Sequence, residues 1–302
     1  MKISLLEAPI CKGSPTDGTQ FAYKRLTENG IGGFFEDGVR FVPMTPCFSD
    51  AGKYPETPLM KDSGEVMSVS RRLFANVRKE LMSGSFPLII GGDHSVAMGS
   101  IAGASSVLGK EKLSVIYIDG HTDINTERST LTGFIHGMPL AAAMGLCSDT
   151  LTVGNKINIF GKNIYIVGAR SIDDGEYSIM RENGVHLCTA DEVKTRGISS
   201  VMTEITDSIQ GGAVHISFDV DFLDETVFSS TSYRMPNGLD LNTLYKILDS
   251  AFSTGRVCSM DVVEYNPTLD AGGADMKKLF DIFKLIAKLV SKYCSECGAF
   301  VL

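Results

Sequence analysis

Three short segments of the chain combine aspartate and histidine at spacings that suit metal chemistry. They are Gly91-Gly92-Asp93-His94-Ser95, Asp119-Gly120-His121-Thr122-Asp123 and Asp219-Val220-Asp221. In an extended backbone, side chains two positions apart point to the same side. Asp119, His121 and Asp123 are therefore expected to face one point, and the same holds for Asp219 and Asp221. Any one of these segments alone is more often a solvated turn, so the prediction depends on the three occurring together.

The ligand types indicate which chemistry such a cluster would support. Four converging carboxylates repel one another and raise one another's pKa. Two divalent cations would cancel four negative charges, and two imidazoles would complete the coordination. A set of Asp and His without Cys favours a harder ion such as Mn²⁺ over a thiolate-rich zinc site. Because two cations that share carboxylates lower the pKa of a water between them, the segments predict a hydrolytic binuclear centre.

Each of the three segments follows a short apolar run, and such runs recur along the chain. The runs predicted as buried strands are Ile3–Leu6, Leu88–Ile90, Ser114–Ile118, Asn163–Val167, Val214–Phe218 and Val257–Val262. Helical spacing of apolar residues predicts helices over 62–83 and around 276–290, and the capping box of Thr189 and Glu192 predicts one that begins near 190. This alternation predicts a three-layer α/β fold, with a mostly parallel twisted sheet flanked by helices. We expect a single domain over residues 1–302, with its ligands beyond the carboxyl ends of the strands.

Composition narrows the class of protein. The 302 residues include 28 Lys+Arg and 36 Asp+Glu, for a net charge of −8. An acidic chain without a basic block argues against nucleic acid or an anionic membrane as the main partner. No secretory signal or transmembrane stretch is evident, because Glu7 interrupts the apolar start and no apolar run reaches 18 residues. The 7 cysteines are an odd number and scattered, which fits reduced thiols and a cytoplasmic location.

Five motifs make the sequence resemble the ureohydrolase family, which includes arginase, agmatinase, guanidinobutyrase and formimidoylglutamase. In family order they are Gly91-Gly92-Asp93-His94-Ser95, Asp119-Gly120-His121-Thr122-Asp123-Ile124-Asn125, His136-Gly137-Met138-Pro139, Ser217-Phe218-Asp219-Val220-Asp221 and Met260-Asp261-Val262-Val263-Glu264. The resemblance extends from about residue 5 to about residue 290. Within the family the chain is most similar to arginases, through the segments 121–126 and 168–173.

The resemblance implies the arginase-like fold and two Mn²⁺ ions per chain, each held by one imidazole and three carboxylates. The first ion would take His94, Asp119, Asp123 and Asp219, and the second would take His121, Asp119, Asp219 and Asp221. Asp119 and Asp219 would then bridge the two ions. Members of the family are commonly trimers or hexamers, so a homo-oligomer is implied as well.

Further residues match positions that act on the substrate. Glu264 matches the acid that binds the guanidinium group, His136 matches the histidine that moves a proton, and Asp123 is expected to bond the nucleophilic water while it ligates metal. At the other end of the substrate, Asn125 and Thr132 match positions that bond the α-carboxylate, and Asp173 matches the position that receives the α-ammonium. The reaction implied is hydrolysis of L-arginine to L-ornithine and urea. Agmatinase, guanidinobutyrase and formimidoylglutamase activities remain as alternatives.

Departures from the family pattern bear on the substrate more than on the chemistry. Phe134 and Ser171 stand where asparagine and aspartate are usual, Gly120 stands where alanine is usual, and the loop Ser229–Gly238 lacks the usual Gly-Thr-Gly-rich pattern. In that loop, Tyr233 or Arg234 could narrow the pocket or bind a substrate carboxylate. His186 and His215 are interpreted as structural. Two other classes stay open: a deacetylase of related fold with one Zn²⁺, and a non-catalytic relative.

Overall fold

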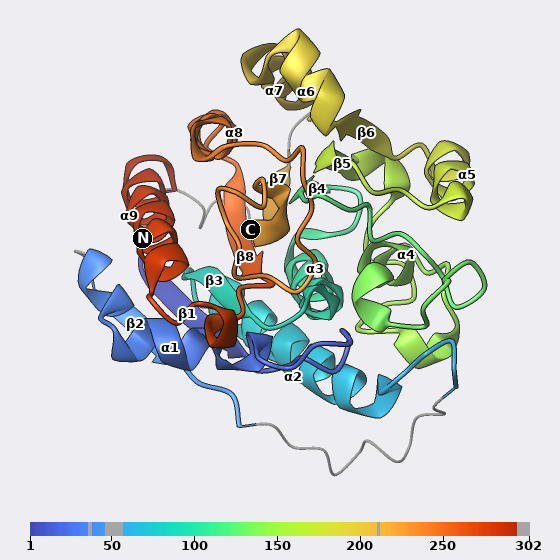
Figure 1. The fold of residues 1–302 in the computed structure, drawn as a ribbon, viewed down its shortest axis with the longest axis horizontal. Coiled ribbons are helices and arrows are strands. Elements are labelled where there is room, and N and C mark those ends of the chain that lie inside the picture. The colour runs from blue at the N-terminus through green and yellow to red at the C-terminus, as the bar shows by residue number, and fades with distance from the viewer. Residues whose placement is uncertain (36–37, 46–56, 210–211, 295–302) are drawn as a thin grey trace.

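The computed structural model describes residues 1–35, 38–45, 57–209 and 212–294. Its core is one eight-stranded sheet, in the order β2-β1-β3-β8-β7-β4-β5-β6, and every neighbouring pair is parallel (Figure 1). The strands are β1 (Ile3–Ala8), β2 (Val39–Val42), β3 (Phe86–Gly91), β4 (Leu113–Ile118), β5 (Ile164–Ala169), β6 (His186–Thr189), β7 (Ala213–Asp219) and β8 (Val257–Val263). The six predicted strands are confirmed. The two that the sequence did not reveal, β2 and β6, are short edge strands without a continuous buried run.

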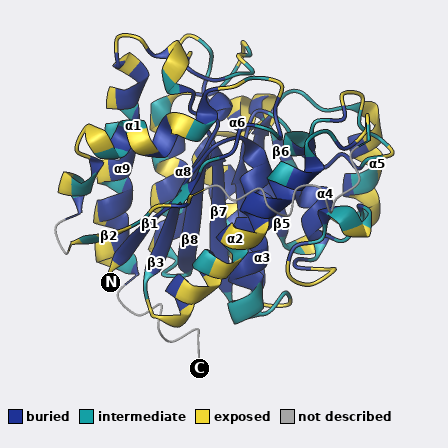
Figure 2. Ribbon diagram, turned by 90° about the horizontal axis from the view of Figure 1, so that it is seen from below, coloured by how far each residue is buried: buried dark blue, intermediate teal, exposed yellow. Residues whose placement is uncertain are grey.

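Helices cover both faces of the sheet, which gives the three predicted layers. They are α1 (Ala22–Glu28), α2 (Ser63–Met82), α3 (Ala97–Leu108), α4 (Pro139–Ala143), α5 (Asp174–Asn183), α6 (Ala190–Arg196), α7 (Ile198–Ser208), α8 (Leu241–Ser253) and α9 (Ala274–Tyr293). One apolar core joins α2, α3 and α4 to the sheet, and a second joins α1, α7, α8 and α9 to its other face. Figure 2 shows the strands buried between the two helix layers. Continuous apolar strands suit this arrangement because both of their faces lie against helices.

The three predicted helices are confirmed. The helix expected over 62–83 is α2, and the stripe around 276–290 lies in α9. Thr189 caps α6, with its side chain accepting from the amide of Glu192 and the Glu192 side chain accepting from the amide of Thr189. Within the described residues, no helix is both long and apolar enough to cross a membrane.

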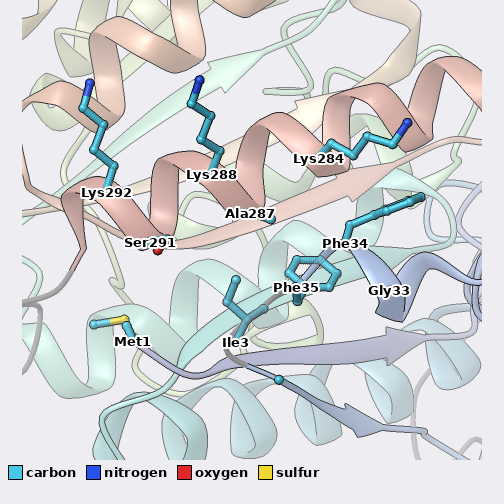
Figure 3. A pocket seen from close by; sticks show the side chains of 11 residues that line it. Met1, Ile3, Gly33, Phe34, Phe35, Lys284, Ala287, Lys288, Ser291 and Lys292 are labelled. Carbon is cyan, nitrogen blue, oxygen red and sulfur yellow. The ribbon is translucent and has the colours of Figure 1, made fainter.

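A groove of about 570 Å³ lies beside the amino end of β1, between residues 31–35 and α9. Its lining includes Ile3, Phe34 and Phe35, with Lys288 and Lys292 on the helix (Figure 3). Figure 3 shows these two lysine side chains extending away from the apolar residues. None of the predicted site residues lines this groove, so it is a feature separate from the strand ends where ligands are expected.

Candidate metal centre

The acidic and histidine segments meet at the carboxyl ends of central strands. Since β3, β8, β7 and β4 are consecutive in the sheet, the residues that follow them share one edge. His94 begins a short 3₁₀ helix just after β3, and Asp119 follows β4 directly. The turn after β3 requires a glycine at position 92, because a Cβ there would sit 1.6 Å from the carbonyl oxygen of Ile10. The close approach of the Gly92 backbone to the carbonyl of Ile10 thus helps to position His94.

A first donor group forms around the His94 imidazole. Its Nδ1 lies 2.9 Å from Asp119 Oδ2, 3.1 Å from Asp123 Oδ2 and 3.2 Å from Asp219 Oδ2. His94 and Asp119 are fully buried, and the other two carboxylates are nearly so. Asp123 adopts a left-handed backbone, with φ of 47°, a strained conformation for a residue with a Cβ. The structure therefore brings together the four residues expected around one ion.

A second donor group shares Asp119 with the first. His121 Nδ1 lies 3.0 Å from Asp221 Oδ2 and 3.6 Å from Asp119 Oδ1. Oxygen and nitrogen donors of His121, Asp119 and Asp221 lie within 4.8 Å of one another, as do those of His94, Asp119 and Asp123. Asp119 thus stands between two sets of donors, as a bridging ligand would.

The peptide backbone orients three of the carboxylates by holding one oxygen of each. Asp119 Oδ1 accepts from the amide of His121 at 2.6 Å, and Asp219 Oδ1 accepts from the amide of Asp221 at 2.7 Å. Asp221 Oδ1 accepts from the amide of Gly120 at 3.0 Å. In each case the second oxygen faces an imidazole. The cluster is therefore preorganised, with one oxygen of each carboxylate left for a further partner.

Unpaired buried atoms show that a cation fits this cluster. His94 Nδ1 and Asp119 Oδ2 are buried and have no hydrogen-bond partner among the described residues, although they lie 2.9 Å apart. Burial, together with the charges of Asp221 and Asp119, raises the pKa of Asp219 well above its ordinary value. Buried carboxylates at such distances need a compensating positive charge, and a divalent cation between the imidazole and the carboxylates would supply it. Hard oxygen donors with imidazole nitrogens suit Mn²⁺ and related divalent ions.

A buried hydrogen-bond chain stands behind His94. Its Nε2 lies 2.9 Å from Ser217 Oγ, which donates to Asp261 Oδ1 at 2.5 Å. The other oxygen of Asp261 accepts from Ser100 at 2.5 Å and lies 2.9 Å from His215 Nε2. Because Ser217 donates to Asp261, it accepts from His94 Nε2–H, so the lone pair of Nδ1 faces the carboxylates. Such outer partners commonly fix the tautomer of a metal-binding histidine.

Glu264 and His136 lie beside the donor cluster. Glu264 Oε1 accepts from the amide of His94 at 3.0 Å and lies 3.4 Å from His136 Nδ1, whereas its Oε2 is buried without a partner among the described residues. Glu264 follows β8 and has φ of 63°, a second strained position at this edge. Burial alone would lower the pKa of His136, but Glu264 and the charges of Asp123 and Asp93 outweigh it and raise that pKa.

The residues expected at the far end of the substrate are only partly assembled. Asn125 Nδ2 donates to Asp173 Oδ2 at 2.9 Å, so these two side chains are paired. Asp173 also caps α5 through a capping box with Glu176. Thr132 lies on an exposed loop, where its amide donates to the Thr130 hydroxyl and its hydroxyl accepts from the amide of Phe134. The pairing of Asn125 with Asp173 was not foreseen.

Two residues at this edge have roles that sequence reasoning missed. His215 was interpreted as structural, yet it belongs to the chain behind His94, and Asp261 appeared only within a motif. A signal was present, since His215, Ser217 and Asp219 alternate along β7 and share one side of the strand. Ser259 and Asp261 alternate likewise along β8, and Ser259 Oγ lies 2.8 Å from His215 Nδ1. Polar residues at alternate positions of buried strands indicate a shared buried network.

Comparisons with known proteins agree with this geometry. A model of the arginase family matches residues 1–288. The chain is 33% identical to an arginase of Bacillus subtilis over 214 residues, covering 70% of this chain and 72% of that protein. It is 34% identical to an arginase of Entamoeba histolytica over 277 residues, covering 89% and 92%. A crystal structure of Entamoeba histolytica arginase in complex with L-ornithine superimposes with a TM-score of 0.86, at 30% identity, covering 94% of this chain and 97% of that one.

Proposed function

Since the chain belongs to the arginase family, we propose that it hydrolyses the guanidino group of L-arginine to give L-ornithine and urea. The observation that carries this proposal is Glu264, whose buried and unpaired Oε2 lies at the edge of a cluster of metal donors. A guanidinium group is planar, permanently charged and rich in donors, so a carboxylate is its natural partner. Glu264 would hold the substrate through this oxygen, with the amide of His94 orienting the carboxylate.

The donor cluster would hold two Mn²⁺ ions, in the two sets that the family resemblance implies. Both donor groups contain Asp119. Asp219 Oδ2 lies 3.2 Å from Nδ1 of His94, and Asp219 Oδ1 accepts from the amide of Asp221, a residue of the second group. When bound, two such ions supply an acidified water as nucleophile for the guanidinium carbon. The contribution of the chain is to hold the carboxylates in place before binding, through the backbone amides of His121, Asp221 and Gly120.

His136 would supply the proton that the departing amine needs. The raised pKa of this imidazole favours its protonated form, and its Nδ1 is 3.4 Å from the carboxylate that would hold the substrate. A side chain that carries a proton beside the bound group is suited to act as a general acid. Asp123 would bond the nucleophilic water through Oδ1, because its Oδ2 accepts from the Tyr117 hydroxyl at 2.8 Å.

The amino-acid end of the substrate would bind at the pair formed by Asn125 and Asp173. Asp173 would receive the α-ammonium, and the amide of Asn125, with Thr132 at the outer edge, would bond the α-carboxylate. The Ser129 hydroxyl donates to Asn125 Oδ1 at 2.8 Å and so fixes the orientation of that amide. Agmatine lacks a carboxylate, and it would leave Asn125 and Thr132 without this partner.

We also propose that the protein is a cytoplasmic homo-oligomer, a trimer or a hexamer. Support for reduced thiols comes from Cys11, Cys147 and Cys188, which are buried and form no disulfide among the described residues. The oligomeric state rests on the resemblance to the family. Light scattering coupled to size-exclusion chromatography would test it, and a monomer at micromolar concentration would contradict it.

A substrate panel on Mn²⁺-loaded protein tests the function. Urea is measured from L-arginine, agmatine and guanidinobutyrate, and formamide is measured from formimidoylglutamate. We expect urea from L-arginine, with kcat/KM at least about tenfold above the other substrates because the α-carboxylate and α-ammonium contribute binding. Selective hydrolysis of another substrate would contradict the assignment. One tightly held Zn²⁺ and no urea would favour a deacetylase, and retained metal without any turnover would favour a non-catalytic relative.

Replacing Glu264 tests the observation on which the proposal depends. In Glu264→Gln the side chain keeps its shape but loses the charge that pairs with the guanidinium, so we expect kcat/KM for L-arginine to fall about a hundredfold. Glu28→Gln, which changes an exposed glutamate on α1, serves as the matched control. An unchanged kcat/KM in Glu264→Gln would remove this residue from substrate binding.

A further inference from the structure

The loop from Ser229 to Gly238, which departs from the family pattern, places an aromatic ring over the candidate site. The Tyr233 ring centroid lies 5.1 Å from that of His136, with the planes tilted by 31°. The same ring lies 5.9 Å from the His121 ring and meets it edge-on, at 82°. His121 belongs to the donor cluster and His136 lies beside Glu264. Tyr233 therefore contacts both imidazoles between which a guanidino group would react.

The beginning of this loop is anchored by a buried carboxylate. Asp275 Oδ2, at the start of α9, accepts from the amide and hydroxyl of Ser229 at 3.0 and 3.2 Å. It also accepts from the amide and hydroxyl of Ser230 at 2.9 and 2.7 Å. Lys278 pairs with the other oxygen of Asp275 at 2.7 Å. Because Asp275 is 3% exposed, these bonds are shielded from water and fix the chain just before Tyr233.

The far side of the loop is anchored by Arg170, which follows β5. Its guanidinium donates to the carbonyl oxygens of Met235 and Pro236 at 3.3 and 3.1 Å, and to that of Asp221 at 2.7 Å. One side chain thus ties the loop to a residue of the donor cluster. Tyr233 lies between the two anchors, so its ring is held in position.

A second departure from the family pattern belongs to the same arrangement. A Cβ at Gly120 would lie 2.5 Å from Arg170 Nη1, 2.9 Å from Asp221 Oδ1 and 3.0 Å from Met235 Cε. Real Cβ atoms essentially never come within 3.0 Å of another atom, so a larger residue at position 120 would shift the Arg170 guanidinium, which anchors the loop. Glycine at this position and the unusual loop therefore fit each other.

We propose that Tyr233 is a specificity-determining residue, which limits the site to guanidino groups whose terminal nitrogens carry no substituent. This inference rests on the proposed function. A guanidino group held between Glu264 and the donor cluster would place its terminal nitrogens beneath the Tyr233 ring. A methyl group on such a nitrogen would need the space that the ring occupies, and the anchored loop cannot yield it without breaking the bonds to Asp275 or Arg170. Tyr233 excludes the substituent by its bulk, so its hydroxyl is dispensable for the discrimination.

The test compares kcat/KM for L-arginine with that for Nω-methyl-L-arginine, following L-ornithine as the product of both. We expect Tyr233→Ala to raise the relative kcat/KM of the methylated substrate about tenfold or more, the range that one methyl group contributes in a fitted pocket. Tyr233→Phe keeps the ring, so it is expected to keep the wild-type ratio of kcat/KM for the methylated substrate to kcat/KM for L-arginine. Phe41→Ala, which removes an exposed aromatic side chain on β2, is the control and is also expected to keep it.

The outcomes separate this inference from the proposed function. If the wild-type protein yields no L-ornithine from L-arginine, the proposed function fails. If the wild type is active and Tyr233→Ala keeps its ratio, the inference about Tyr233 is overturned. Tyr233→Trp guards against misfolding of the alanine variant, because a larger ring should lower the relative kcat/KM of the methylated substrate further. A ratio that is unchanged or raised in Tyr233→Trp would also overturn the inference.

Discussion

The donor cluster and the substrate end of the site are held in place by different means. The carboxylates of the cluster lie at or just beyond strand ends and are buried, and three of the four are oriented by backbone amides, as with Asp119 and the amide of His121. The substrate end is built from loops and is held by side chains, as with the pair of Asn125 and Asp173 and the anchors of the Tyr233 loop. A backbone contact persists when a side chain changes, whereas a side-chain pair is lost with either partner. The chemistry should therefore be harder to alter by mutation than the specificity, except at the donors themselves.

The largest effect is expected from replacing Asp119, because this residue belongs to both donor groups. In Asp119→Asn one negative charge is lost from each group, so we expect turnover to fall about a thousandfold or more, equivalent to about 4 kcal/mol of barrier. Metal content after dialysis, measured by mass spectrometry, should fall in parallel. Asp191→Asn changes an exposed carboxylate on α6 and should alter neither quantity. Full metal content with normal turnover in Asp119→Asn would mean that the donor groups are not the metal centre.

The next largest effect is expected at Asp261, which supports the donor cluster from behind. In Asp261→Asn the acceptor of Ser217 is weakened and the orientation of His94 is no longer fixed. Removing an outer partner of this kind typically weakens metal affinity about 10- to 100-fold, and we expect a loss in this range. The measurement is a titration of metal-free protein with Mn²⁺, and Ser217→Ala should show the same change. Wild-type affinity in both variants would show that His94 needs no such support.

A smaller effect is expected at the substrate end, where Asp173 has two roles. Asparagine is as good a helix cap as aspartate, so Asp173→Asn should keep α5 intact while removing the charge that would receive the α-ammonium. We expect KM for L-arginine to rise about tenfold, with metal affinity unchanged. Thr132→Ala, at an exposed position, should change KM by about threefold or less. An unaltered KM in Asp173→Asn would leave this residue with its capping role alone.

The smallest effect on catalysis is expected at the anchor of the loop, where stability responds instead. Burial alone would raise the pKa of Asp275, but its bonds from Lys278, Ser230 and Ser229 outweigh burial and lower that pKa. A lowered folded-state pKa contributes stability above the ordinary carboxyl pKa, and this contribution is lost as pH falls through the folded value. Asp275→Asn should therefore lower the free energy of unfolding by about 1–3 kcal/mol at pH 7, and by less at acidic pH.

A matched control for this prediction lies on the same helix. Asp281 pairs with Lys284 at 2.9 Å with the same spacing as Asp275 and Lys278, but its side chain is 63% exposed. Solvent screens such a pair, so Asp281→Asn should change stability little. Denaturant unfolding at neutral and acidic pH distinguishes the two variants. Equal stability losses would mean that burial of Asp275 contributes nothing.

Sequence patterns were sufficient where a feature depends on residues close together in the chain. The six central strands and α2, α6 and α9 were predicted because continuous apolar runs, helical spacing and a capping box are local signals. The edge strands β2 and β6 carry no such run, since no residue of β2 and only one residue of β6 is buried, and they were missed. The meeting of the donor segments was also predictable, because parallel strands bring the segments that follow them to one edge of the sheet.

Other features depend on residues that only folding brings together. The Glu264 carboxylate meets the amide of His94 across 170 positions, and the hydroxyl of Ser100 meets Asp261 across 161. No local period relates such positions, so their bonds were not foreseen. His215 differs, because its alternation with Ser217 and Asp219 along β7 was a local signal.

The amino-acid sequence by itself thus determined the fold class, the candidate metal donors and the residue types suited to hydrolysing a guanidino group. Local periodicity and charge are properties of neighbouring residues, and they can be read without coordinates. Tertiary structure alone decided that Asn125 pairs with Asp173, that Thr132 is exposed, and that Tyr233 lies over His121 and His136. These outcomes depend on where loops come to rest, which is set by packing and hydrogen bonds between segments far apart in the chain.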